Sequence, residues 1–258
     1  MPPVHPKKRM GQHFLTDPEA IARIVHAVQG ADTVVEIGPG MGVLTQGLLE
    51  RFGCRLHCLE VDREAVAYLR REFPTLGSNL HEGDCLRFDF STLTGSMAWA
   101  GNLPYNISSQ ILFQLLDQRD RVAEAVFMLQ REVAARIAEG PGSRDYGILS
   151  VLLQAWYDVE YLFTVDEHVF NPPPKVKSGV IRLRRNARQS LGCSETLFKQ
   201  VVKTGFNQRR KTVRNSLRGL FGSDYDYSDL IFSQRPEQLG VEEFISLTLR
   251  LEELQAKA

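Results

Sequence analysis

The sequence has few features of a secreted protein, a metalloprotein or a membrane protein. Its 258 residues include only four cysteines, with no C-x-x-C pair and no histidines beside them at metal-ligand spacing. No apolar run approaches the ~20 residues of a membrane helix, and residues 1–7 lack the apolar segment of a secretory signal. We therefore expect a cytoplasmic protein with reduced thiols, no membrane segment and no metal.

The chain also has no formal net charge at pH 7, but its charged residues are unevenly distributed along the sequence. The chain has 31 Lys and Arg residues against 31 Asp and Glu. Between residues 168 and 222 the only acid is Glu195, whereas thirteen residues are basic. A charge run is usually only a solvated face, but so strong an excess favours binding to nucleic-acid phosphates. Lys7, Lys8 and Arg9 add a second basic segment near the amino terminus.

A glycine-rich turn, Gly38-Pro39-Gly40-Met41-Gly42, follows an apolar segment predicted to be a strand. The glycines are spaced G-x-G-x-G, so the dinucleotide fingerprint G-x-G-x-x-G fails by one residue. No Lys-Ser/Thr pair follows, which excludes a Walker A phosphate loop. Such a turn suits a ligand whose backbone-contacting part is small, such as the amino-acid end of S-adenosylmethionine. A plain strand-to-helix turn is the alternative.

Polar side chains end the next three predicted strands. Glu60 lies at the distance from the glycine turn at which α/β nucleotide sites place a carboxylate on ribose hydroxyls. Asp84 ends the next strand, where it can accept a hydrogen bond from an adenine amino group, and Asn102 follows the third. We expect these groups to converge where open α/β sheets bind ligands. Asp62 is instead expected to cap the helix predicted over 63–72.

The third of these strands leads into the tetrapeptide Asn102-Leu103-Pro104-Tyr105. The Asn102 carboxamide can accept a hydrogen bond from the exocyclic amine of a flat base, and Pro104 has no N–H to compete. Tyr105 offers a ring on which the base can stack. The alternative is a strand-ending turn, because Asn and Pro are common turn residues.

Together these motifs resemble the KsgA-type ribosomal RNA adenine dimethyltransferases, which modify two adjacent adenines in the 3′-terminal hairpin loop of 16S RNA in the small ribosomal subunit. The resemblance runs nearly end to end. It is carried by residues 8–15, 36–42, 102–105, 127–133, 170–176 and 206–214.

The resemblance implies a class I S-adenosylmethionine-dependent methyltransferase: an α/β, Rossmann-like fold with a mostly parallel seven-stranded sheet and a small C-terminal all-helical domain. We expect a catalytic domain over 1–188 and a helical RNA-binding domain over 189–258. The implied cofactor-binding residues are His13, Leu15, Gly38, Glu60, Asp84 and Asn102. Many relatives have Asn where this chain has His13.

The implied catalytic residues are Asn102, Pro104, Tyr105 and Phe170. Hydrogen bonds from the adenine N6 protons to Asn102 and to a backbone carbonyl of Leu103 or Pro104 would draw that nitrogen towards tetrahedral geometry. Tyr105 and Phe170 would sandwich the flipped base. For Phe170 the alternative is a core aromatic before a rigid proline run. A dedicated general base is not required, because the methylated nitrogen is strongly acidic.

The order of predicted elements agrees with this fold. Strands and helices alternate from residue 33 to 116, as a parallel sheet requires. Segments 159–165 and 178–183 are predicted to form a hairpin that closes the sheet, preceded by a helix over 149–157. After a linker at 187–193, short helices are predicted over 196–205, 211–220, 227–231 and 241–254.

The expected partner is 16S ribosomal RNA in a late assembly particle of the small subunit, bound by a monomer. Two alternatives remain at this stage. One is the related family that methylates an adenine of large-subunit RNA and confers antibiotic resistance; Leu103 and residues 206–214 favour the small-subunit enzyme. The other is a non-catalytic assembly or transcription factor on the same fold, against which the intact cofactor residues and Asn102-Leu103-Pro104-Tyr105 argue.

Overall fold

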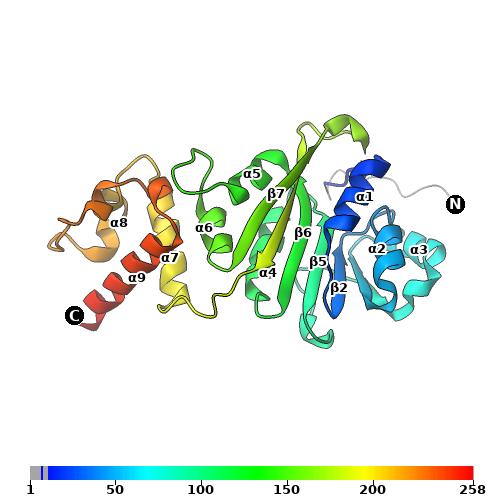
Figure 1. Ribbon diagram of the computed structural model, residues 1–258, viewed down its shortest axis with the longest axis horizontal. Helices are drawn as coiled ribbons and strands as arrows, with labels where there is room; N and C mark the ends of the chain where they lie inside the picture. Colours follow the sequence, from blue (N-terminus) through cyan, green and yellow to red (C-terminus); the bar gives the residue numbers. More distant parts are fainter. Residues whose placement is uncertain (1–6, 8–10, 258) are drawn as a thin grey trace. The chain divides into compact units, whose positions relative to one another are not determined.

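A computed structural model describes residue 7 and residues 11–257. Its main sheet has seven strands in the order β4-β3-β2-β5-β6-β9-β7 (Figure 1). The strands are β2 (Thr33–Ile37), β3 (Leu56–Glu60), β4 (Leu80–Glu82), β5 (Met97–Asn102), β6 (Val122–Gln130), β7 (Tyr157–Val165) and β9 (Ser178–Arg185). Strands β2 to β6 pair in parallel and β9 pairs antiparallel with β6. The predicted mostly parallel, Rossmann-like sheet is therefore confirmed.

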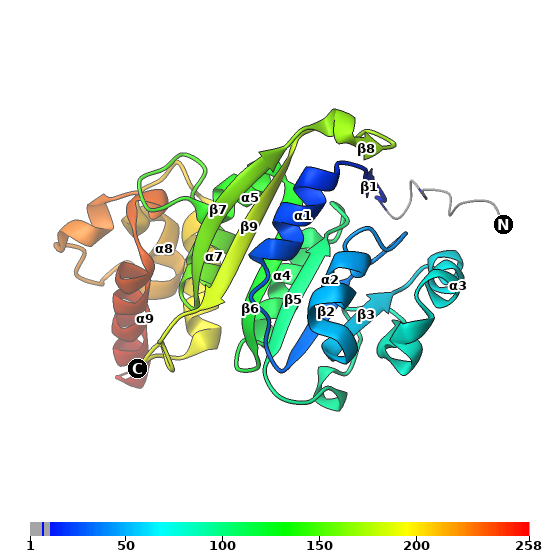
Figure 2. The same ribbon diagram turned by 45° about the vertical axis from the view of Figure 1, so that its right-hand side comes forward.

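Five helices precede, connect or follow the parallel strands. They are α1 (Pro18–Ala27), α2 (Thr45–Phe52), α3 (Arg63–Glu72), α4 (Ser108–Asp117) and α5 (Arg131–Ala138). Residues of α1, α2 and α3 share one apolar core with side chains from β2, β3 and β5. Figure 2 shows α1 and α2 over one face of the sheet, with α4 behind the strands. Alternating strand residues thus face two helical layers, as in doubly wound folds.

Single aspartates cap two of these helices, and the cap at Asp62 was predicted from the sequence. Asp17 caps α1 by accepting a hydrogen bond from the Glu19 N–H, with Pro18 in the first turn. Asp62 caps α3 in the same way through the Glu64 N–H. The cap on α3 is connected to the site, because the Asp62 N–H donates to the Glu60 carboxylate.

A second, two-stranded antiparallel sheet lies apart from the main one. It pairs β1 (Phe14–Leu15) with β8 (Phe170–Asn171), with Leu15 opposite Phe170. The Thr16 N–H extends the pairing to the Val169 carbonyl at 2.8 Å. This small sheet ties the amino-terminal segment to the connection between β7 and β9.

The remaining helices belong to a second compact unit formed by residues 135–158 and 186–258. It contains α6 (Ile148–Gln154), α7 (Glu195–Asn207), α8 (Val213–Phe221) and α9 (Val241–Ala256). Aromatic stacking of Phe206 on Phe244, with ring centroids 5.8 Å apart, forms part of its core. The predicted C-terminal helical part is therefore confirmed as a fold feature.

The boundaries differ from expectation in three places. Residues 135–158 pack with the C-terminal helices, although the sequence analysis placed them in the domain that ends at 188. The functional division at 188 stays a prediction. The helix expected over 149–157 ends at Gln154, because Tyr157 already begins β7. The helix expected over 227–231 is a 3₁₀ turn over Leu230–Ser233, capped by Asp229.

Within the described residues, no helix is long and apolar enough to cross a membrane, and no cluster of three or more potential ligands is arranged for a metal ion.

Candidate active site

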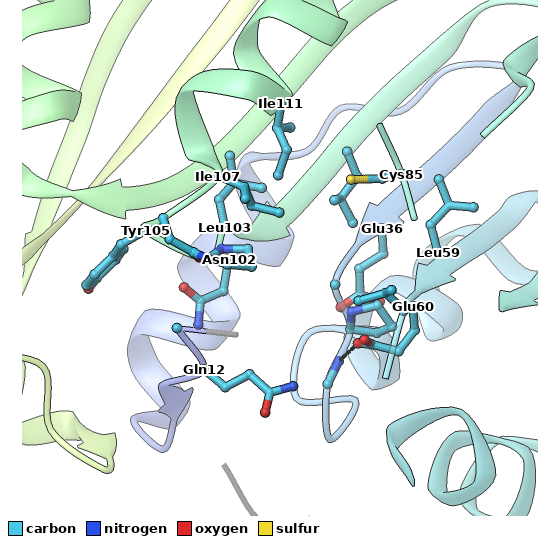
Figure 3. A pocket seen from close by; sticks show the side chains of 18 of the residues that line it. Gln12, Glu36, Leu59, Glu60, Cys85, Asn102, Leu103, Tyr105, Ile107 and Ile111 are labelled. Atoms are coloured by element: carbon cyan, nitrogen blue, oxygen red, sulfur yellow. Dashed lines mark hydrogen bonds between the residues drawn. The ribbon is translucent and has the colours of Figure 1, made fainter. Parts of the chain in front are cut away.

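A cavity of about 330 Å³ opens at the carboxyl ends of β2, β3, β4 and β5. The sheet order reverses between β2 and β5, so this is the topological switch point at which open α/β sheets bind ligands. In Figure 3, Asn102 and Tyr105 lie on one side of the cavity, and Glu36 and Glu60 on the other. Seven of the predicted site residues line it: His13, Gly38, Glu60, Asp84, Asn102, Pro104 and Tyr105.

The glycine turn forms one wall because its backbone adopts conformations that favour glycine. Gly38 and Gly40 have φ values of 68° and 57°. A Cβ on Gly40 would also approach a ring carbon of Phe14 to 2.9 Å, so a side chain there would displace that ring. The turn therefore lets Phe14 and the backbone close on the cavity together.

Glu60 is a buried carboxylate held in one orientation. Its two oxygens accept the Gly40 N–H at 2.9 Å and the Asp62 N–H at 2.8 Å. Burial raises the pKa of Glu60, while these two backbone bonds favour the ionised form. Each carboxylate oxygen has a further lone pair, so the fixed group can still accept bonds from ligand hydroxyls.

Asp84 and its neighbours form the next part of the wall. One Asp84 oxygen accepts the Leu86 N–H at 3.0 Å, which orients the side chain at the end of β4. Cys85 is buried beside it, and Ile107 and Ile111 of the α4 region add apolar surface (Figure 3). An acceptor next to apolar walls suits a flat base with an exocyclic amine.

Asn102 has an orientation fixed by the amino-terminal segment. Its Nδ2 donates to the His13 carbonyl oxygen at 2.9 Å. Because a carbonyl can only accept, this contact assigns the amide nitrogen to the His13 side and leaves Oδ1 as the acceptor. The following backbone is fixed too, since Leu103 N–H donates to the Met128 carbonyl at 2.9 Å.

Tyr105 is held at its ring and at its hydroxyl. The ring stacks with His13 at a centroid distance of 5.6 Å and an interplanar angle of 29°. The hydroxyl lies 2.7 Å from Ser178 Oγ. His13 in turn donates from Nδ1 to the Pro172 carbonyl at 2.8 Å.

Leu15 and Phe170 do not line the cavity. Leu15 is 1% exposed and Phe170 4% exposed, and both belong to the apolar core. They are cross-strand partners, and strand alternation turns Phe14, rather than Leu15, towards the cavity. The interpretation of Phe170 as a core aromatic fits this position. Stacking of Phe170 on a base would require its ring to leave the core, so that role stays a prediction.

Two further polar residues line the cavity, Gln12 and Glu36, and neither was predicted from the sequence. Glu36 is 1% exposed and accepts the Thr45 hydroxyl at 2.6 Å. Burial raises the pKa of Glu36 to about 7. A carboxylate inside the apolar strand β2 was a signal in the sequence that could have identified Glu36.

Gln12 donates to the Asp62 carboxylate at 3.3 Å, and the same carboxylate accepts Lys7 Nζ at 2.6 Å. Lys8 and Arg9, the rest of the expected basic segment, lie outside the described residues.

S-adenosylmethionine fits the residues that are present. Its ribose diol needs paired acceptors, and Glu60 provides a fixed carboxylate at the end of β3. Its adenine amine needs an acceptor beside apolar surface, which Asp84 provides. Its compact amino-acid end needs a close backbone approach, which the turn at Gly38 allows.

Comparisons with known proteins identify the family. The model of the ribosomal RNA adenine dimethylase family matches residues 5–233. The chain belongs to this family. The predicted S-adenosylmethionine-dependent methyltransferase that acts on ribosomal RNA is thereby confirmed, as is its cofactor.

Similar curated proteins cover almost the whole chain. "Ribosomal RNA small subunit methyltransferase A" of Parabacteroides distasonis is 57% identical over 250 residues, which are 95% of this chain and 94% of that protein. The protein of the same name from Flavobacterium johnsoniae is 52% identical over 257 residues, 98% of each chain.

Two solved structures share the fold. A dimethyladenosine transferase from Plasmodium falciparum superposes with a TM-score of 0.77 at 24% identity, covering 94% of this chain and 98% of that one. The 23S rRNA methyltransferase ErmE superposes with a TM-score of 0.65 at 25% identity, covering 91% and 99%.

Proposed function

We propose that the protein transfers methyl groups from S-adenosylmethionine to N6 of two adjacent adenines in the 3′-terminal hairpin loop of 16S ribosomal RNA. The observation that carries the proposal is the orientation of Asn102. Its Nδ2 is committed to the His13 carbonyl, so Oδ1 is the acceptor at the cavity beside Tyr105. An acceptor next to an aromatic ring is what an adenine amino group and its flat ring require.

A second acceptor is expected from the backbone of the same loop. The Pro104 carbonyl already accepts the Ile107 N–H at 3.2 Å. Its oxygen keeps a second lone pair, so the Leu103 and Pro104 carbonyls are both candidates for the second N6 proton. Two acceptors on the two protons draw the N6 lone pair out of conjugation with the ring and aim it into the cavity.

The reaction needs alignment more than acid–base chemistry. Bound S-adenosylmethionine supplies a sulfonium methyl that is already strongly electrophilic. Glu60, Asp84 and the Gly38 turn would hold the cofactor at one side of the cavity, opposite Asn102. Alignment of this kind contributes a large share of the rate of displacement reactions. The proton left on N6 after transfer is acidic enough to pass to solvent or substrate RNA.

Fewer basic residues are available to bind RNA than the sequence suggested. Several of the thirteen basic residues are paired within the protein: Lys177 with Asp166, Arg182 with Glu160, and Arg188 with Glu242. Arg209 donates to the Arg144 carbonyl. Arg210, Lys211, Arg214 and Arg218, around and along α8, are exposed and remain the best candidates for phosphate contacts.

The names of the relatives point to two different RNA substrates. The curated relatives above 50% identity are named for the small subunit, whereas ErmE, at 25% identity, is named for 23S RNA. The higher identity supports the small subunit. We further propose that the substrate is a late assembly particle, because the two target adenines must be unpaired and exposed. The protein is also proposed to act in the cytoplasm and as a monomer.

One assay separates the small-subunit enzyme from its alternatives. Purified protein is incubated with labelled S-adenosylmethionine and either immature small subunits or large subunits. Label in small-subunit RNA alone supports the proposal, and label in large-subunit RNA would support the resistance-type enzyme. Binding to the particle without any label would indicate a non-catalytic assembly factor.

A further inference from the structure

Tyr105 reaches across the fold to the first residue of β9. Its hydroxyl lies 2.7 Å from Ser178 Oγ, and the two residues are 73 positions apart in the sequence. Ser178 is fully buried and lies opposite Gln130 in the pairing of β6 with β9. Ser178 is buried and Tyr105 is half-buried, so breaking this bond would leave the Ser178 hydroxyl without a partner and without ready access to water.

The start of β9 is a rigid support for that bond. At the next residue, Gly179, a Cβ would approach the Ala134 Cβ to 2.7 Å and the Tyr161 hydroxyl to 2.9 Å. Such close packing leaves the backbone around Ser178 little room to move. The serine hydroxyl therefore occupies a fixed place relative to β6, the strand whose Met128 carbonyl also holds Leu103.

The same connection holds the ring from a second direction. The Pro172 carbonyl, six residues before Ser178, accepts the His13 Nδ1–H at 2.8 Å, and the His13 ring stacks on Tyr105. One end of Tyr105 is fixed by the loop after Pro104 and the other by Ser178. The plane of the ring is thus set before any base arrives.

We propose that Ser178 is a positioning residue for methyl transfer, acting through the Tyr105 hydroxyl to orient the ring on which the target adenine stacks. This inference rests on the proposed function. A displaced ring would let the base tilt, so that N6 would no longer lie in line with the methyl group. Misplacement by about 1 Å can cost up to 10²-fold in rate. Loss of one anchoring bond, with the ring still present, should cost about tenfold in kcat.

A double-mutant cycle with Ser178→Ala and Tyr105→Phe tests the inference. Each variant should lower kcat on small-subunit RNA about tenfold, and the double variant should be no slower than either one. The Kd of S-adenosylmethionine should not change in any of the three. Thr33→Val is the matched control: it removes a buried hydroxyl bond, to Thr94 O at 2.8 Å, at the far end of β2, and should leave kcat unchanged.

Additive losses in the double variant would overturn the inference, because the two hydroxyls would then act independently. An unchanged kcat in either single variant would overturn it too. Tyr105→Phe leaves β9 untouched, so it tests the bond even if Ser178→Ala folds poorly, as judged by its melting temperature. A wild-type protein that transfers no methyl group would instead contradict the proposed function.

Discussion

The Asn102 side-chain amide donates a 2.9 Å hydrogen bond to the backbone carbonyl of His13, 89 residues earlier in the sequence. The contact fixes the amide so that its oxygen is the acceptor. It also explains why the amino-terminal segment matters for chemistry performed by a loop after β5. Because the acceptor is oriented by backbone rather than by another side chain, substitution of His13 itself would leave this bond intact.

Glu60→Ala should weaken the binding of S-adenosylmethionine about ten- to a hundredfold. The substitution removes the acceptor expected for the ribose hydroxyls, and a hydrogen bond to a charged group contributes ~1.5–3 kcal/mol. Isothermal titration calorimetry measures the change. Glu82→Ala is the control, because Glu82 ends the neighbouring strand but pairs with Arg63 outside the cavity. Equal affinities for wild type and Glu60→Ala would disprove the assignment.

Glu36→Gln should make stability less dependent on pH. The folded-state pKa of Glu36 is about 7, raised by burial from 4.5. The folded protein therefore keeps a proton that the unfolded chain loses, so wild type loses stability as pH rises from about 4.5 through 7. The full loss is ~3 kcal/mol, reached above about pH 8.

Gln cannot titrate but can still accept the Thr45 hydroxyl bond. Urea unfolding at pH 5 and pH 8 should therefore show a smaller fall in unfolding free energy for Glu36→Gln than for wild type. A fall of the same size in both proteins would show that Glu36 is ionised in the folded state at pH 5.

Charge reversal at Arg210 and Lys211 should weaken binding to small-subunit particles and flatten its salt dependence. Each lost phosphate contact lowers the slope of log K against log salt by about 1. The affinity for free S-adenosylmethionine should not change. Lys257→Glu, an exposed reversal after the last helix, is the control. If cofactor and RNA affinities fell together, these residues would support folding rather than bind phosphate.

Much of the cavity could be predicted because it depends on where strands end. Glu60, Asp84 and Asn102 each follow an apolar strand, and parallel strands bring their carboxyl ends to one edge. The cap at Asp62 was predicted as well, because capping is a local interaction.

Leu15 and Phe170 lie outside the cavity because of strand pairing between segments that are distant in the sequence. The two-residue strand β1 is too short to show an alternating pattern, and its partner β8 decides that Leu15 faces the core. The same pairing buries Phe170. The Tyr105–Ser178 bond likewise arises from the way β9 pairs with β6, which no local motif encodes.

Asn102 is proposed to bind the adenine amino group in both methylations. Mass spectrometry of nuclease-digested small-subunit RNA, methylated by wild type or by Asn102→Ala, tests it most directly. Wild type should give dimethyladenosine at two adjacent positions, and Asn102→Ala should lose about 10²- to 10³-fold in rate, as for removal of one polar group that stabilises a transition state. Dimethyladenosine at undiminished yield from Asn102→Ala would contradict the account and reduce the tetrapeptide to a structural turn.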